Sequence, residues 1–306
     1  MKLNLRLFFL SSLALIAFAG NSLLCRWALA GQQIDALSFT LIRLMSGAIT
    51  LLFLYWVFEA KPVRALFKLN HQALTGMSRL KNLSGPFWLF IYAAGFSYAY
   101  LSLETGIGAL ILFAAVQISM IGLNIIKGDR PSLVQWVGIL ISFSGFIYLL
   151  LPTLSSPSLV GFILMTAAGV AWGVYSLEAK QVNPEKDSAL TKTARNFIWS
   201  LPFALVLLFL SLLLSGTDSF FIENKGIYLA LTSGALTSGV GYAIWYQVVK
   251  VLNATLASVS QLLVPVIATA MGVAFLGEAI ELNFIVATLM VLGGVMLVLL
   301  QKGKQA

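Results

Sequence analysis

Long apolar runs separated by short polar breaks dominate this chain. A transmembrane helix needs about 20 consecutive apolar residues, and runs of this length predict about ten membrane spans. Their approximate bounds are 7–30, 37–58, 86–103, 106–126, 132–151, 159–178, 190–214, 226–249, 255–276 and 283–301. Glycine, proline, serine or charged residues fill the breaks between the runs. The pattern therefore predicts an all-α integral membrane protein.

Short matching sequences recur at a fixed spacing of 149 residues. The matched pairs are Gly20 with Gly169, Asp129 with Glu278, and Gly145 with Gly294. Five predicted spans fall in each half, and because five is odd, the second copy must cross the membrane in the opposite direction. We therefore predict two inverted five-helix repeats, residues 1–151 and 152–306. Inverted repeats around a central site are a recurring architecture of secondary transporters.

Composition and charge agree with a membrane protein. Hydrophobic residues make up 59% of the chain and charged residues 10%, whereas soluble domains carry about a quarter charged residues. The net charge of +8 is spread over the loops rather than on one polar face, which argues against a nucleic-acid partner. If both termini are cytoplasmic, the outer loops hold only Lys225 as a basic residue, as the positive-inside rule requires.

Two segments have more than one interpretation. Lys2 and Arg6 precede an apolar run, as in a signal peptide, but the run continues to Ala30 and is predicted as the first span. The polar break Lys61–Gly85 is predicted either as a helix in the inner headgroup region or as a disordered basic loop. It contains the only histidine, His71, which we interpret as a solvated side chain.

The spans lack the groups that membrane enzymes use. No predicted span contains an aspartate or a histidine, so paired aspartates, histidine clusters and serine–histidine pairs are absent from them. The single cysteine, Cys25, can form no internal disulfide. We therefore expect neither enzymatic activity nor a bound metal or other cofactor.

Charged residues in or beside the spans are functional candidates, because ionisable groups are costly inside a membrane. Those predicted for gating or structural contacts are Arg43, Glu104, Glu178 and Arg195. The alternative is that the arginines snorkel or bind backbone carbonyls. Arg26 is predicted to bind a solute carboxylate, since a guanidinium favours planar anions. The predicted partners of these arginines are Asp35 and Glu104 on the outer side, and Glu178 and Asp187 on the inner side.

Aromatic and amide side chains inside the spans are predicted to line a solute site. Trp172 and Tyr175 are three residues apart and share one helix face. Besides Arg26, the predicted lining residues are Asn21, Tyr98, Gln117, Trp172, Tyr175, Tyr242, Tyr246 and Gln261. Apolar walls with a few fixed polar groups suit an amphipathic organic solute. The alternative is helix packing with an interfacial aromatic belt, for which Tyr100 and Trp245 are the main candidates.

Small residues mark one face of the fifth and tenth spans. They are Gly138, Ser142 and Gly145 in the fifth span, and Gly293 and Gly294 in the tenth. Small residues allow close helix contact. The two spans are therefore predicted either to pair with each other or to form the seam of a homodimer.

The ordered set of motifs resembles the drug/metabolite transporter superfamily, in particular its EamA-domain members. Phe18-Ala19-Gly20-Asn21 with Arg26 is similar to the first-helix pattern of that family, in which tryptophan is usual at the position of Phe18. Arg43 fits the arginine early in the second helix, and Ala171-Trp172-Gly173-Val174-Tyr175 with Lys180 fits the sixth. Pro265, Leu276-Gly277-Glu278 and Gly293-Gly294 fit the end of the second copy. Gln117 departs from the family, which usually has proline there.

The resemblance implies a bacterial plasma-membrane carrier of small metabolites, frequently an exporter of amino acids or related solutes. We expect a secondary transporter that works by alternating access, with the lipid bilayer and a small-molecule solute as its partners. Two alternatives remain, an uncoupled facilitator of similar solutes and a non-transporting membrane receptor or scaffold.

Overall fold

The computed structural model describes residues 5–59, 66, 76–126, 132–150, 158–180, 188–216, 220–251 and 260–302. Its helices are α1 (Leu5–Ala30), α2 (Ala36–Glu59), α4 (Gly76–Ala99), α5 (Thr105–Ile126), α6 (Leu133–Leu150), α7 (Leu159–Lys180), α8 (Ala189–Ser215), α9 (Asn224–Thr232), η2 (Ser233–Val240), α10 (Gly241–Val251), α12 (Leu263–Leu276) and α13 (Leu282–Lys302). Within these residues, six helices are long and apolar enough to cross a membrane, and shorter apolar helices accompany them. Helices satisfy their backbone hydrogen bonds internally, as a lipid environment requires. The chain is therefore an all-helical, multi-pass membrane protein.

Helix α4 starts earlier than predicted. Residues 76–85 form its first turns and are not a separate interfacial helix or a loop, and Pro86 lies inside the helix. A proline removes one backbone hydrogen bond, but α4 continues through it and packs against α7 and α8. Ser84 also donates a hydrogen bond to Glu178 of α7. His71 lies outside the described residues.

The eighth predicted span consists of three consecutive helical segments, α9, η2 and α10. The middle segment, η2, is a π-helix with the sequence SGALTSGV. π-helical segments are rare and are frequently found at functional sites. The sequence predicted a continuous span here but gave no indication of the wider helix in its middle.

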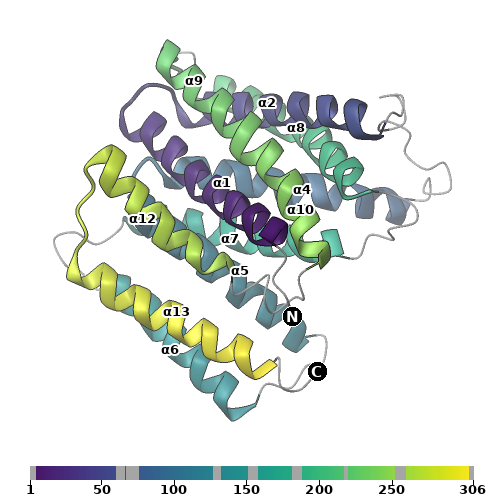
Figure 1. Cartoon of the computed structure of the whole chain (residues 1–306). Coiled ribbons are helices and arrows are strands. Elements are labelled where there is room, and N and C mark those ends of the chain that lie inside the picture. The colour runs from purple at the N-terminus through teal and green to yellow at the C-terminus, as the bar shows by residue number, and fades with distance from the viewer. Residues whose placement is uncertain are drawn as a thin grey trace.

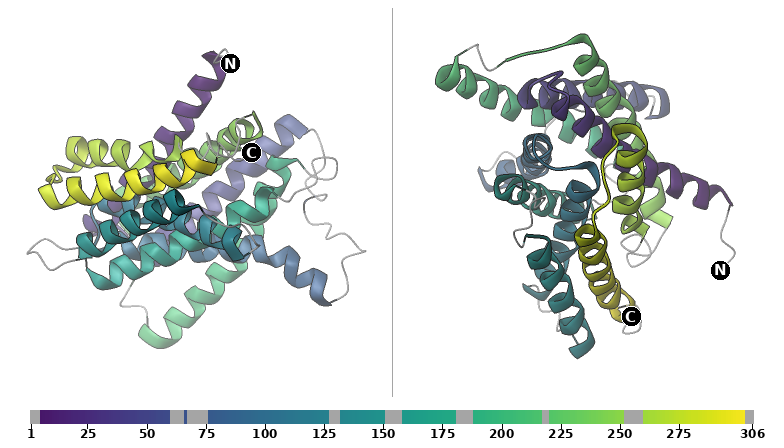
Figure 2. Two further views of the ribbon diagram at one scale, coloured as in Figure 1. Left: turned by 90° about the horizontal axis from the view of Figure 1, so that it is seen from below. Right: turned by 90° about the vertical axis from the view of Figure 1, so that its left-hand side faces the viewer.

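The helices form one interleaved bundle with a helix pair at its edge (Figure 1). Helix α1 packs against α12 and against α9, η2 and α10, while α7 packs against α4 and α5. Helix α2 packs against α8 and η2. Helices α6 and α13 lie side by side away from the centre, as the two rotated views also show (Figure 2).

Small residues bring α6 and α13 of the same chain into close backbone contact. A Cβ atom added to Gly138 would lie 2.6 Å from the carbonyl oxygen of Gly294. Ser142 donates a hydrogen bond of 3.1 Å to the carbonyl oxygen of Val291. The prediction that the small faces of these two helices pair with each other is therefore confirmed.

Candidate functional site

A cluster of aromatic rings lies at the centre of the bundle, around Trp172 of α7. The Trp172 ring centroid is 4.8 Å from those of Tyr92 on α4 and Tyr242 on α10. Tyr175, one turn along α7, stacks on Trp172 at 5.3 Å. Phe18 of α1 meets Tyr242 edge-on at 5.9 Å. We call Phe18, Tyr92, Trp172, Tyr175 and Tyr242 the central aromatic cluster; all five are buried.

Asn21 is the polar centre of this cluster. Its Oδ1 accepts hydrogen bonds from the hydroxyls of Ser233 at 2.7 Å and Thr237 at 3.2 Å, both on the π-helix η2. Its Nδ2 donates to the Tyr92 hydroxyl at 3.2 Å, and Tyr242 donates to the same hydroxyl at 3.3 Å. One amide therefore connects α1, α4 and η2, and the Tyr92 hydroxyl to which it donates also accepts a hydrogen bond from Tyr242 of α10.

Arg43 of α2 borders the same cluster from another side. Its Nη2 donates a hydrogen bond of 3.0 Å to the carbonyl oxygen of Ala93 on α4. The guanidinium carbon lies 5.0 Å from the Phe96 ring centroid, 5.6 Å from that of Tyr92 and 6.0 Å from that of Phe39. These distances are within the range of cation–π attraction. Tyr92, a member of the cluster, thus contacts both Arg43 and the Trp172 ring.

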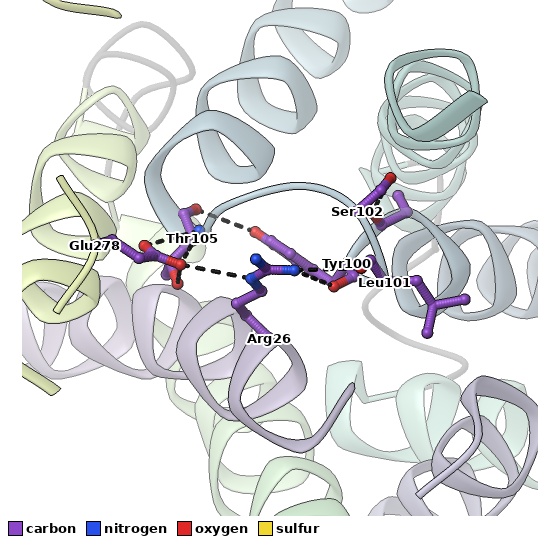
Figure 3. A network of polar contacts seen from close by, with 7 residues as sticks. Arg26, Tyr100, Leu101, Ser102, Thr105 and Glu278 are labelled. Carbon is purple, nitrogen blue, oxygen red and sulfur yellow. Dashed lines mark hydrogen bonds and ion pairs between the residues drawn. The ribbon is translucent and has the colours of Figure 1, made fainter. Parts of the chain in front are cut away.

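A second polar site, the Arg26 network, joins side chains and backbone groups at the ends of several helices (Figure 3). The Arg26 Nε atom is 3.6 Å from Oε1 of Glu278, and its Nη1 donates to the carbonyl oxygens of Tyr100 at 3.1 Å and Leu101 at 3.3 Å. Glu278 also accepts hydrogen bonds from the Thr105 N–H and hydroxyl, both at 2.9 Å. The network joins α1, the end of α4, the start of α5 and the residue pair that follows α12.

Two glycines place Glu278 in this network. Gly277 ends α12 with a positive φ of 68°, a conformation that glycine adopts without strain. The Glu278 N–H then donates to the Gly272 carbonyl oxygen at 3.3 Å. A Cβ atom on Gly272 would collide with the Glu278 carboxylate and lie 3.0 Å from the Thr105 Cβ. Gly272 therefore leaves the space in which the carboxylate reaches α5.

Glu104 adds a further carboxyl group beside the Arg26 network. It precedes α5 and is partly buried. Burial raises its pKa above the ordinary value of 4.5, the negative charges of Glu278 and Glu281 raise it further, and Arg26 partly offsets these effects. Arg26 thus pairs with Glu278, and neither Asp35 nor Glu104 forms the ion pair predicted from the sequence.

Glu178, near the end of α7, forms polar contacts with the start of α4, at the end of α4 that is remote from the Arg26 network. Its carboxylate accepts a hydrogen bond from Ser84 of α4, and its carbonyl oxygen accepts one of 2.9 Å from Lys192 of α8. Arg195 lies one turn further along α8 and is partly buried. Glu178 therefore links α4, α7 and α8.

The structure brings together part of the predicted solute site. Asn21, Trp172, Tyr175 and Tyr242 belong to the cluster or contact it. Gln117 is buried in α5, Tyr98 is partly buried in α4, and Gln261 is partly buried just before α12. Tyr246 lies in α10, but its side chain is outside the description. No group of three metal-binding side chains gathers within the described ranges.

Tyr92 is the main residue that sequence reasoning missed. Tyr92, Phe96 and Tyr100 follow one another at four-residue spacing, from α4 into the turn that follows it, and the centroids of successive rings are 5.4 Å and 4.8 Å apart. That spacing was a usable signal. Tyr100 is fully buried, so it does not belong to an interfacial belt at the protein surface. Its hydroxyl donates a hydrogen bond of 3.3 Å to the Thr105 carbonyl oxygen. Trp245 packs against Phe18 at 5.5 Å.

Comparison with known proteins gives consistent matches over almost the whole chain. The EamA-like transporter family model matches residues 159–300. The uncharacterized protein PA1977 of Pseudomonas aeruginosa is 40% identical over 296 residues, covering 96% of this chain and 94% of the relative. The uncharacterized transporter YoaV of Bacillus subtilis is 21% identical over 272 residues, covering 86% and 87%. A solved crystal structure with 18% identity superposes with a TM-score of 0.62, covering 95% of this chain and 98% of the other.

Proposed function

Because this chain belongs to the EamA-like transporter family, as its motifs predicted, we propose that it is a secondary transporter working by alternating access. The proposed cargo is a small amphipathic organic solute, such as an amino acid, and the proposed direction is export across the bacterial inner membrane. The observation that carries this proposal is the central aromatic cluster with Asn21, where buried rings and a few fixed polar groups meet from α1, α4, α7, η2 and α10. Such a combination suits an amphipathic ligand.

The proposed architecture is a pair of inverted five-helix repeats, residues 1–151 and 152–306. The helix bounds support it, because α6 shifted by 149 residues falls on α13, and α1 falls on α7. The packing supports it too. Helix α1 contacts α12 and the consecutive segments α9, η2 and α10, and its counterpart α7 contacts α5 and α4, which are their counterparts in the first repeat. Ser142 bonds the carbonyl of Val291, the residue 149 positions later, as expected beside a pseudo-two-fold axis.

The proposed orientation places both termini in the cytoplasm and the Arg26 network on the outer side. The network links α1 and α5 of the first repeat to Glu278 of the second. It would therefore hold the outer side closed, and opening would require the Arg26–Glu278 contact and the Thr105 hydrogen bonds to break. The predicted role of Arg26 in solute binding then belongs to the outward-open state, in which its donors are released.

The test begins with purified protein and a thermal-stability screen of amino acids, organic acids and phosphorylated sugars, since a bound ligand raises the melting temperature. Flux of the selected solute is then measured in proteoliposomes. We expect Trp172→Ala and Tyr242→Ala each to weaken transport by about tenfold or more, because each variant removes a buried aromatic side chain from the central aromatic cluster.

The matched control is Trp56→Ala, because Trp56 of α2 is 63% exposed on the outside of the bundle. This variant is expected to transport like wild type. Unchanged flux in both Trp172→Ala and Tyr242→Ala would show that the cluster is not the solute site.

A second candidate function is uncoupled facilitated diffusion. Its support is that the central aromatic cluster consists of Phe18, three tyrosines and Trp172 around Asn21, so none of the residues that form it is a carboxylic acid that could carry a proton. A pH gradient imposed across the proteoliposome membrane separates the two functions. Accumulation of solute against its own gradient would favour coupled transport, and equilibration alone would favour the facilitator.

A further inference from the structure

Arg43 is a buried cation with no anionic partner among the residues that the structure describes. Its side chain is 2% exposed, two turns into α2 from Ala36. While Nη2 is hydrogen-bonded to the Ala93 carbonyl oxygen, Nη1 is buried and has no hydrogen-bond partner in the described part of the chain. No carboxylate in the described ranges lies within 4.0 Å of this guanidinium.

Within the described part of the chain, no negative charge therefore compensates that of Arg43 in this conformation. A guanidinium is always protonated in proteins, and burying an unpaired charge is costly. The rings of Tyr92 and Phe96 attract a cation, but they carry no net charge. Ionisable groups kept inside a membrane protein without a partner are functional candidates. A negatively charged group from a ligand would neutralise the guanidinium and bond the donor that the protein leaves unused.

Tyr92 connects this unpaired cation to the proposed solute site. Its ring is 5.6 Å from the Arg43 guanidinium carbon and 4.8 Å from the Trp172 centroid. Its hydroxyl bonds Asn21 and Tyr242. A solute whose apolar part lies against Trp172 would thus have Tyr92 at its side and Arg43 immediately beyond.

We propose that Arg43 is the anion subsite of the central aromatic cluster, and that it binds the carboxylate of an organic anion or zwitterion. This inference rests on the proposed transport function and narrows its substrate class. A guanidinium matches a planar carboxylate through parallel hydrogen bonds. Arg26 is less suited to this role here, because Glu278 and two backbone carbonyls already engage it.

The test uses two probes that share a ring and differ in charge, phenylacetate and phenylacetamide. The melting temperature of the purified full-length protein is measured against the concentration of each. We expect wild type to be stabilised at lower concentrations of phenylacetate than of the amide. Arg43→Gln should raise the half-saturating phenylacetate concentration by about tenfold or more, as expected for a lost charged hydrogen bond, and leave that of the amide unchanged.

Two further variants control this experiment. Arg6→Gln removes a charge from an exposed position of α1 and should keep the wild-type preference. Arg43→Lys retains the charge but not the planar guanidinium group. We therefore expect its preference for phenylacetate over phenylacetamide to lie between those of wild type and Arg43→Gln. Arg43→Lys also decides the question if Arg43→Gln does not fold, since a preference equal to that of wild type would overturn the proposal.

Equal stabilisation of wild type by the two probes, or an undiminished preference in folded Arg43→Gln, would also overturn the anion subsite. Flux measurements separate this from failure of the proposed function. If organic solutes cross proteoliposomes without any Arg43-dependent carboxylate preference, the subsite fails and transport stands. If the preference depends on Arg43 but no solute crosses, the subsite stands and the transport proposal fails.

Discussion

At the scale of single residues, the Glu278 carboxylate and the Arg26 guanidinium lie between helix ends of opposite polarity. Glu278 binds the N–H of Thr105 at the start of α5, and Arg26 binds two carbonyls at the end of α4. Helix dipoles favour an anion at an N-terminus and a cation at a C-terminus. Each side chain therefore complements both its helix end and the other side chain.

Glu104 makes the region of the Arg26 network sensitive to pH. Burial and the charges of Glu278 and Glu281 raise the Glu104 pKa in the folded protein. Folding thus disfavours the charged form of Glu104, which lowers the free energy of unfolding at neutral pH. This loss of stability is relieved as the pH falls through the raised pKa. We expect a shift from neutral pH toward about pH 5 to raise the melting temperature of wild type more than that of Glu104→Gln.

The control for this prediction is Glu223→Gln, because Glu223 is exposed just before α9. Its melting temperature should follow pH as that of wild type does. A response of Glu104→Gln identical to wild type, measured by intrinsic tryptophan fluorescence, would contradict the assignment of this pH dependence to Glu104.

The sequence predicted the separate members of the two sites better than their partners. Trp172 and Tyr175 share a helix face by spacing alone, and Asn21 stood out as an amide within an apolar run. The Arg26–Glu278 pair could not be predicted in this way, because it depends on the rotation of α1 and on the chain direction after Gly277. The hydrophobic pattern fixes neither of these.

At the scale of helices, the length of each apolar run predicted most of the bounds, because a span must match the thickness of the bilayer. Helix α4 departs from this, since its polar first turns continue the helix through Pro86. The π-helix η2 departs as well. Hydrophobic periodicity does not report the width of a helix, and the contact of η2 with Asn21 became visible only in three dimensions.

The contact between α6 and α13 permits a matched test of helix packing. A Cβ atom on Gly294 would collide with the Gly138 carbonyl oxygen and the Ser142 hydroxyl, whereas a Cβ on the neighbouring Gly293 meets nothing within 4 Å in the described residues apart from its own stretch of helix backbone. Gly294→Ala is therefore expected to destabilise the protein by about 1–3 kcal/mol through overpacking. Gly293→Ala should cost no stability. Equal melting temperatures of the two variants in detergent would contradict the close contact.

At the scale of the whole molecule, helices from one half pack mainly against helices from the other. Helix α1 contacts α12 and the consecutive segments α9, η2 and α10, α7 contacts α4 and α5, and α6 contacts α13. The two halves therefore share one core, and the central aromatic cluster draws residues from both. Under the proposed mechanism, the solute site is reached by shifting helices of one half against those of the other, without unfolding either.

This motion can be stopped at the proposed outer side by a disulfide between α5 and α12. Gly106 is in the first turn of α5, and a Cβ atom there would lie 3.0 Å from the Cβ of Thr269, within about 1 Å of the usual disulfide spacing. The variant Gly106→Cys/Thr269→Cys is made in a Cys25→Ala background, since Cys25 is the only native cysteine. Oxidised protein should show no solute flux in proteoliposomes, because α5 and α12 could no longer separate.

Reduction in the same proteoliposomes supplies the control and should restore the flux. The oxidised protein should still be stabilised by the solute, since the disulfide leaves the central aromatic cluster and the opposite side untouched. Binding without flux is what an outward-closed carrier requires. Full flux through oxidised protein whose crosslink is verified by mass spectrometry would mean that α5 and α12 stay together throughout the cycle, and the outer opening would then have to be sought elsewhere in the bundle.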